Sequence, residues 1–193
     1  MKLRNEFDVG VPPERTWDTL LDLPRVARAL PGATIDPDPE GGAWRGTMKI
    51  KLGPVTTEYA GSARVQDVDE DDRVARFRVE GREIRGQGSA AATITTRLAD
   101  HAGGTHVVVD TELQVTGRQA QLGRGLMEDV AGAILGEFAG RLERELRGEG
   151  PSGAPPAVLD VGAAVRGPVL ERAGLVLGGV LAGLALGRVV WRR

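Results

Sequence analysis

The sequence contains no cysteine and only two histidines. Without cysteine there can be no disulfide bond, no thiolate nucleophile and no metal centre held by thiolates. Both histidines, His101 and His106, lie in or beside the turn predicted at residues 99–105, where only Asp100 and Asp110 could complete a metal site. Two histidines at an exposed turn are a weak basis for metal binding. We therefore expect no metal ion.

Aromatic residues are also scarce, at 4% of the chain, and the net charge is only −2. A core with so few aromatic side chains must be filled mainly by Val, Leu and Ala. No strip of interleaved basic and aromatic residues runs along the chain, so we expect no nucleic acid partner. The first ten residues lack the apolar run of a secretory signal, which predicts a cytoplasmic location for the folded part.

Motifs for catalysis are missing as well. None of the three serines lies in the strand–turn–helix context of a nucleophile elbow. Gly86 and Gly88 do not lead into a predicted helix, so they indicate a turn and not a phosphate-binding loop. If the protein were an enzyme, its acid–base group would be a cavity residue such as Glu58, Tyr59 or Glu112. Nothing favours one of these three, and we expect no enzymatic activity.

The pattern of apolar residues predicts the fold. Apolar and polar residues alternate over residues 2–9 and in several runs between residues 33 and 116, as in half-buried antiparallel strands. Pro12-Pro13 and Pro31-Gly32 bound two short helices. Apolar residues then recur every four positions from Leu122 to Leu146, which indicates one helix of about 24 residues. We predict an α+β helix-grip fold, a curved sheet of six to seven strands wrapped on a long C-terminal helix.

Small residues occupy several positions on the predicted inner face of this sheet, where a packed core would have Leu, Ile or Phe. Either the long helix lies closer to the sheet at these positions, or an apolar cavity remains for a small molecule. A curved sheet that grips one helix tends to enclose such a pocket, so we favour the cavity. The small residues are Gly61, Ala63, Ala75, Ala90, Ala92 and Thr111.

The composition changes after residue 147. Residues 148–157 are rich in Gly and Pro, which predicts a linker between a domain at residues 1–147 and a tail at residues 158–193. The first part of the tail, residues 158–170, could lie on a surface as a weakly amphipathic helix.

The rest of the tail is strongly apolar. Residues 173–187 carry no charge and would be about 22 Å long as a helix, against about 30 Å for the bilayer core. The tail could also fold back as a buried helix, but we favour membrane association, with crossing or surface binding left open. Arg192 and Arg193 favour the cytoplasmic side for its end. The predicted anchor residues are Leu175, Leu177, Val180, Leu181, Leu184 and Trp191.

Several segments also carry a family resemblance. They are LPGA at residues 30–33, KIKLGPV at 49–55 with YAG at 59–61, GT at 104–105 and TGRQAQLGR at 116–124. Together they resemble the G-subunit family of carbon monoxide dehydrogenase, within the START and polyketide-cyclase-like (SRPBCC) superfamily. The resemblance extends over nearly all of residues 1–147. It implies a helix-grip fold, membrane association through a C-terminal segment, and service to a molybdenum hydroxylase of the carbon monoxide dehydrogenase type.

This resemblance and the predicted cavity together suggest a function. We expect the cavity to bind an apolar lipid, a respiratory quinone such as menaquinone or ubiquinone. The protein would then link the dehydrogenase to the electron transport chain at the cytoplasmic face of the membrane. Tyr59 could donate a hydrogen bond to a quinone carbonyl. The expected lining residues are Met48, Tyr59, Ala63, Phe77, Ala92, Leu126, Val130 and Ile134.

Two other functions stay open at this point. The protein could be a membrane adaptor or maturation factor for the dehydrogenase that binds no ligand. It could also act on a hydrophobic substrate as a cyclase or hydrolase, as relatives in fold do, although a shared fold does not establish a shared activity.

Overall fold

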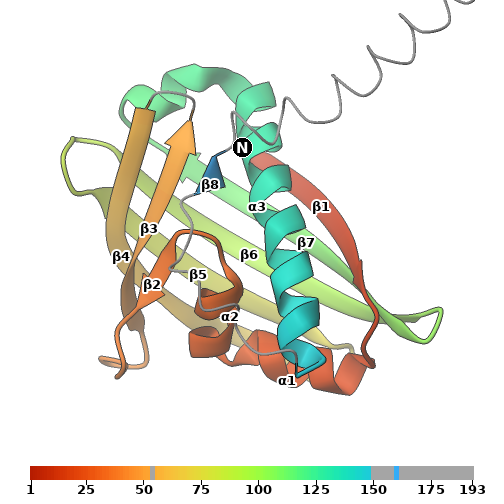
Figure 1. The fold of residues 1–193 in the computed structure, drawn as a ribbon. Helices are drawn as coiled ribbons and strands as arrows, with labels where there is room; N and C mark the ends of the chain where they lie inside the picture. Colours follow the sequence, from red (N-terminus) through yellow and green to blue (C-terminus); the bar gives the residue numbers. More distant parts are fainter. Residues whose placement is uncertain (53–54, 149–158, 161–193) are drawn as a thin grey trace, which may run out of the picture.

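The computed structural model describes residues 1–52, 55–148 and 159–160. A curved antiparallel sheet wraps around one long C-terminal helix, and two short helices close one end of the fold (Figure 1). This arrangement confirms the predicted α+β helix-grip fold.

Strands β2 to β7 form a meander, and β1 pairs with β7 at one edge of it. The spatial order of the strands is β1-β7-β6-β5-β4-β3-β2, and neighbours in this order are antiparallel. In β4 the register shifts between Val65 and Asp67, a bulge of the kind that increases local bending. Because side chains alternate along each strand, one face of the sheet points to the helix and the other points outward. The strands are β1 (Lys2–Val9), β2 (Ala33–Ile35), β3 (Trp44–Leu52), β4 (Val55–Asp69), β5 (Val74–Glu83), β6 (Ser89–His101) and β7 (Gly104–Val115).

The helices begin and end close to the predicted positions. Pro13 occupies the first turn of α1, and the Asp22 side chain caps α2 by accepting a hydrogen bond of 3.1 Å from the Arg25 backbone N–H. The long helix starts one residue after the predicted Leu122. The bounds are α1 (Pro13–Leu21), α2 (Leu23–Ala29), the 3-10 helix η1 (Arg118–Leu122) and α3 (Gly123–Leu146).

The turn from α2 into β2 depends on Gly32. Its φ is +76°, and a Cβ at this position would lie 2.2 Å from the carbonyl oxygen of Lys49 on β3. The Gly32 carbonyl itself accepts a 2.8 Å hydrogen bond from the Lys49 N–H. Only glycine combines this backbone conformation with so close an approach.

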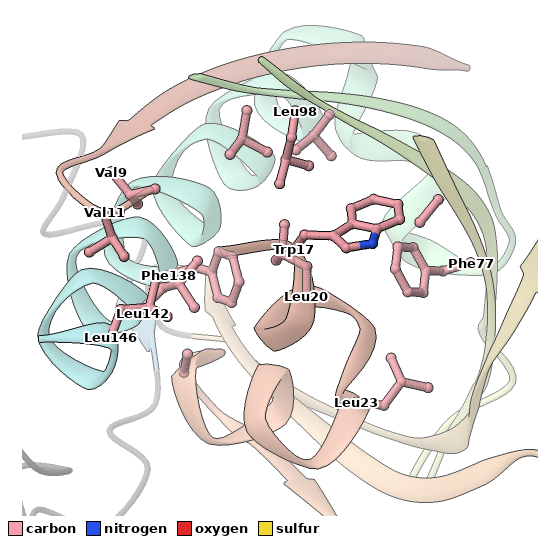
Figure 2. Packing of buried hydrophobic residues seen from close by; sticks show 14 residues of the cluster. Val9, Val11, Trp17, Leu20, Leu23, Phe77, Leu98, Phe138, Leu142 and Leu146 are labelled. Atoms are coloured by element: carbon pink, nitrogen blue, oxygen red, sulfur yellow. The ribbon is translucent and has the colours of Figure 1, made fainter. Parts of the chain in front are cut away.

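One end of the inner face is closed by α1, α2 and the C-terminal half of α3 (Figure 2). Trp17 and Leu20 of α1 lie between the sheet and α3. Phe7 and Phe138 pack edge to face, with ring centroids 5.9 Å apart. We call this region the packed end. Its buried residues include Val9, Val11, Trp17, Leu20, Leu23, Phe77, Leu98, Phe138, Leu142 and Leu146.

Polar contacts also fix the end of α3 at the packed end. Arg15 donates a 2.7 Å hydrogen bond to the carbonyl oxygen of Leu146, the last residue of the helix. Glu145 forms ion pairs with Arg25 and Arg28 of α2 at 3.4 and 3.3 Å. Cations near a helix C-terminus also interact favourably with its backbone dipole. The sequence predicts a cover of the sheet by the long helix alone, whereas in the structure α1 and α2 share it.

Two residues of the predicted tail belong to the described structure. Leu159–Asp160 form a short strand, β8, which pairs in parallel with Ile50 and Lys51 of β3. The surface helix expected over residues 158–170 is therefore wrong at these two residues. The cause is the exposed edge of β3, which β2 pairs only from Gly46 to Met48 and whose remaining backbone groups attract another strand.

The rest of the tail, including every predicted anchor residue, lies outside the described residues, as does most of the predicted linker. Within residues 1–52, 55–148 and 159–160, no helix is both long enough and apolar enough to cross a bilayer.

Candidate ligand-binding site

The inner face is less completely covered at the end away from α1 and α2. There α3 lies against β1, near one edge of the sheet, whereas β3 and β4 lie toward the other edge (Figure 1). Val130 is the buried centre of a small cluster in which Leu126 and Ile134 of α3 meet Ile50 of β3, all three of them half-buried. These half-exposed apolar side chains on the inner face are therefore not completely covered by other parts of the described structure.

We call this region the open end. It comprises the inner-face residues at the ends of β3 to β7 that lie beyond the packed end, together with the N-terminal half of α3. It also includes Gln119 of η1, which contacts Thr57. Its residues include Met48, Ile50, Thr57, Tyr59, Glu83, Gln119, Leu126, Val130 and Ile134.

A row of very small residues crosses the inner face between the two ends. Gly46, Gly61 and Gly81 are direct cross-strand partners on β3, β4 and β5, and Ala90 continues the row on β6. A Cβ at Gly61 would lie 1.9 Å from the carbonyl oxygen of Glu80. The strands can therefore approach this closely only without a side chain, and the bare backbone leaves room above it.

Gly61 and Ala90 are among the small residues predicted on the inner face, whereas Gly46 and Gly81 are not. Both glycines continue an alternation that the sequence shows, two residues beyond Trp44 and two beyond Val79. Following the alternation of each strand to its next inward position would have found them.

All eight predicted lining residues face the interior, but the structure separates them into groups. Met48 and Tyr59 are cross-strand partners at the open end, and Leu126, Val130 and Ile134 of α3 cluster there with Ile50, two residues beyond Met48 on β3. In a second group, which lies toward the packed end, Ala63 and Ala92 both pair with Val79 and Phe77 is 7% exposed in the packed core. Figure 2 shows Phe77 beside Trp17. The role of the eight residues in ligand binding stays a prediction.

Four polar side chains interrupt the apolar inner face at the open end: Thr57, Tyr59, Glu83 and Gln119. Tyr59 and Glu83 are cross-strand partners. Burial, and secondarily the negative charge of Glu83, raise the pKa of the Tyr59 phenol above its usual value of 10.0. Gln119 Nε2 donates a weak 3.5 Å hydrogen bond to the Thr57 hydroxyl. The site thus has one protonated phenol and one carboxylate side by side.

Two of the three acid–base candidates from the sequence are on the outer face, so those two assignments are wrong. Glu58 pairs with Lys49 at 3.7 Å, and Glu112 pairs with Lys2 at 2.9 Å. Among the described strands, Glu83 is the carboxylate that takes an inward position, opposite Tyr59. Glu83 lies four residues after the inward Val79, so strand alternation points it to the same face. Its position near the Gly86 turn, however, gave no reason to place it inside the fold.

The histidine turn is polar and exposed. His106 Nδ1 lies 2.7 Å from an oxygen of Asp8, and the rings of His101 and His106 are 6.0 Å apart. In the described part of the chain, no three His, Cys, Asp or Glu side chains are grouped so that they could hold a metal ion.

Two hollows of the described surface lie mainly on the outer face of the sheet. The first, about 800 Å³, is bordered by β1, β5, β6 and β7 and reaches Arg124 and Glu128 of α3. The smaller, about 520 Å³, lies over β3 and β4 beside Arg45. None of the eight predicted lining residues borders either hollow. The open end of the inner face is thus distinct from both hollows.

Solved structures with the same fold are numerous. A conserved protein from Geobacillus kaustophilus is 16% identical, with a TM-score of 0.65 over 77% of this chain and 97% of that one. A protein from Thermus thermophilus is 19% identical, with a TM-score of 0.53 over 74% and 97%. The Zhui aromatase/cyclase from Streptomyces sp. R1128 is 15% identical, with a TM-score of 0.50 over 78% and 98%. These similarities show the fold alone.

No protein with curated annotation matches the sequence. The model of one family, described as the G subunit of carbon monoxide dehydrogenase (CoxG), matches residues 6–147. This match confirms the resemblance found in the sequence. The chain therefore belongs to the CoxG family of carbon monoxide dehydrogenase, a family of accessory subunits.

Proposed function

We propose that this protein is a membrane-associated accessory subunit that holds a respiratory quinone in its open end. It would thereby connect a molybdenum hydroxylase of the carbon monoxide dehydrogenase type to the electron transport chain. One observation carries the proposal: the inner face at the open end is apolar but only half-buried, as at Met48, Leu126 and Ile134. A ligand chain that covers such side chains gains about 25 cal/mol for each Å² of apolar surface removed from water.

The polar end of a quinone finds a hydrogen-bond donor in the same region. Tyr59 forms no hydrogen bond with any described residue, and its raised pKa keeps the phenol protonated at neutral pH. A phenol in this state can donate to a quinone carbonyl while the isoprenoid chain lies over Met48 and Ile50. Sites for small molecules commonly combine an apolar lining with a few polar groups in this way.

The place where the tail leaves the domain agrees with this proposal. Asp160 of β8 pairs with Lys51 of β3 beside the open end, and the predicted membrane tail continues from that residue. A tail that binds the membrane from this point would hold the mouth of the open end near the lipid in which quinones dissolve. The ligand would then have a short path between bilayer and protein.

The test is to purify the full-length protein from a quinone-containing host and measure extracted quinone by mass spectrometry. We expect about one quinone per chain. Met48→Trp would fill the open end and reduce the bound quinone at least tenfold, whereas Ala60→Trp on the exposed outer face would leave it unchanged. Equal quinone in both variants would contradict the proposed site.

Membrane association needs a separate measurement. The full-length protein should sediment with vesicles of phosphatidylethanolamine and phosphatidylglycerol. The double variant Leu177→Glu and Leu181→Glu should stay in solution, because carboxylates enter the apolar phase of a membrane only at high cost. Both proteins should still contain quinone. Vesicle binding without any extractable quinone would instead favour the adaptor that binds no ligand.

A further inference from the structure

We infer that Glu83 and Gln119 accept hydrogen bonds from the hydroxyl groups of a reduced quinone, so that the open end binds the hydroquinone more tightly than the quinone. This inference rests on the proposed function and adds the redox form of the ligand to it. It assigns a role to two residues that the sequence analysis did not select.

The two side chains meet at the turn between β5 and β6. The position that a Cβ would take at Gly88 lies 2.9 Å from Glu83 Oε2 and 2.9 Å from Gln119 Oε1, so the two oxygens are close neighbours. A Cβ at Gly86 would lie only 2.2 Å from Glu83 Oε2. The Gly86-Gln87-Gly88 turn therefore leaves a space without side chains, which these two acceptor oxygens occupy.

Both oxygens have unused capacity to accept hydrogen bonds. Gln119 Oε1 is buried and has no donor among the described residues. Glu83 accepts one long hydrogen bond, 3.3 Å from the Gly88 N–H, and no described cation forms an ion pair with it. A carboxylate can accept about four hydrogen bonds, and it has no proton to donate. The folded protein thus leaves two acceptor groups, the Glu83 carboxylate and Gln119 Oε1, without enough hydrogen-bond donors among the described residues.

The two redox forms of a quinone differ in this respect. A quinone presents two carbonyl oxygens, which can only accept, whereas a hydroquinone presents two hydroxyl groups, which can donate. Acceptors such as Glu83 and Gln119 satisfy the hydroxyls but repel the carbonyls. Tyr59 can donate to a carbonyl or accept from a hydroxyl, so it serves both forms. The acceptors therefore decide the preference.

A preference for one redox form changes the potential of the bound ligand. A tenfold tighter complex with the hydroquinone raises the two-electron reduction potential of the bound couple by about 30 mV. The bound quinone would then accept electrons more readily than the same quinone in the membrane. An accessory subunit of an electron-donating dehydrogenase would use such a shift.

The experiment measures the affinity of the full-length protein, stripped of lipid, for three probes under anaerobic conditions. The probes are decylubiquinone, decylubiquinol, and the dimethyl ether of decylubiquinol, which keeps the shape but has no hydroxyl donor. Quenching of tryptophan fluorescence and calorimetry report binding. We expect decylubiquinol to bind about tenfold more tightly than the other two probes, as one well-placed hydrogen bond provides.

Two variants and two matched controls locate the effect. Gln119→Leu and Glu83→Gln should each reduce the preference for decylubiquinol to about twofold or less, because each weakens acceptance from its hydroxyls and relieves the repulsion of the quinone carbonyls. The Glu83→Gln side chain still has an oxygen for the Gly88 N–H, so the turn is retained. Gln114→Leu and Glu80→Gln change the same residue types on the outer face and should behave like the parent.

The possible contrary results are distinguishable. Equal affinity for all three probes, or a preference that survives in both variants, would overturn the inference and leave the proposed function intact. Failure of the parent to bind any probe would overturn both. If farnesol displaced decylubiquinol at equal concentration, the acceptors would recognise a lipid alcohol, and the assignment to a hydroquinone would be wrong.

Discussion

The packed end and the open end are parts of one sheet, and they differ in what covers them. At the packed end, three helices meet the inner face, and side chains such as Val107 and Leu142 are fully buried. At the open end, the N-terminal half of α3 contacts β3 through a small cluster, and apolar side chains stay half-exposed. The fold thus concentrates its stability at one end, which frees the other for a ligand.

The largest expected effect is a loss of stability at the packed end. Leu142 is 0% exposed, so Leu142→Ala should lower the free energy of unfolding by about 2–5 kcal/mol through lost burial and a new cavity. Leu126→Ala, the same change on the same helix at the open end, should cost about 1 kcal/mol because that side chain is only half-buried. Urea denaturation measures both. Equal losses would show that the open end is packed like the rest of the core.

The second prediction concerns the boundary between the two ends. A Cβ at Gly61 would meet backbone atoms of β5 at 1.9 and 2.7 Å, so Gly61→Ala must push two strands apart. We expect a loss of about 1–3 kcal/mol in the free energy of unfolding. Gly136→Ala on α3 is the control, since no described atom lies within 4 Å of the added methyl. The Gly136→Ala variant should be more stable by up to about 1 kcal/mol, because alanine has the higher helix propensity. If Gly61→Ala were as stable as the parent, the glycine row would not be needed for the close approach of the strands.

Local patterns in the sequence predicted much of this architecture. The alternation of residues predicted which side chains of β1 and of β3 to β7 point inward, and the four-residue recurrence placed α3 within one residue of its start. Both patterns come from the geometry of a single element, which the sequence records directly. The inward direction of Met48, Tyr59 and Ala63 was predicted for the same reason.

Long-range features could not be predicted in this way. The sharing of the cover among three helices, the pairing of β8 with β3 and the contact of Gln119 with Thr57 all depend on where distant segments meet. Glu83 illustrates the difficulty, since a glutamate two residues after a glycine and beside a turn usually faces water. Its inward position follows only from the register that pairs it with Tyr59.

The third prediction uses the fact that Tyr59 is the only tyrosine of the chain. Ultraviolet absorbance of the phenolate therefore reports on this one side chain. We expect a titration midpoint above 10.0 in the parent, and a lower one in Glu83→Gln, where the smaller of the two causes is removed and burial remains. Glu80→Gln on the outer face should leave the midpoint unchanged. A midpoint that is the same in Glu83→Gln as in the parent would show that the Glu83 charge does not act on the Tyr59 phenol, and it would contradict a polar site made of these two residues.

The same raised pKa has a consequence for stability, with a definite sign. Below a pH of about 10, Tyr59 is protonated in the folded and the unfolded chain, so it adds no pH dependence there. As the pH rises further, the unfolded chain loses the proton first, and stability falls until the folded phenol also ionises. When the pH is raised from neutral to above 10, the free energy of unfolding of Tyr59→Phe should therefore fall less than that of the parent.

The smallest effect compares ion pairs at the two ends of α3. Glu145 is 18% exposed and lies 3.4 and 3.3 Å from Arg25 and Arg28, so Glu145→Gln should cost about 0.5–1 kcal/mol. Glu128, which is 49% exposed and pairs with Arg124 at 2.8 Å near the open end, should contribute about 0.3 kcal/mol or less. Urea denaturation at low and high salt would measure both, and salt should reduce the second contribution more. A larger loss for Glu128→Gln would contradict this comparison, because the pair between Glu128 and Arg124 lies within one helix, whereas Glu145 joins α3 to α2.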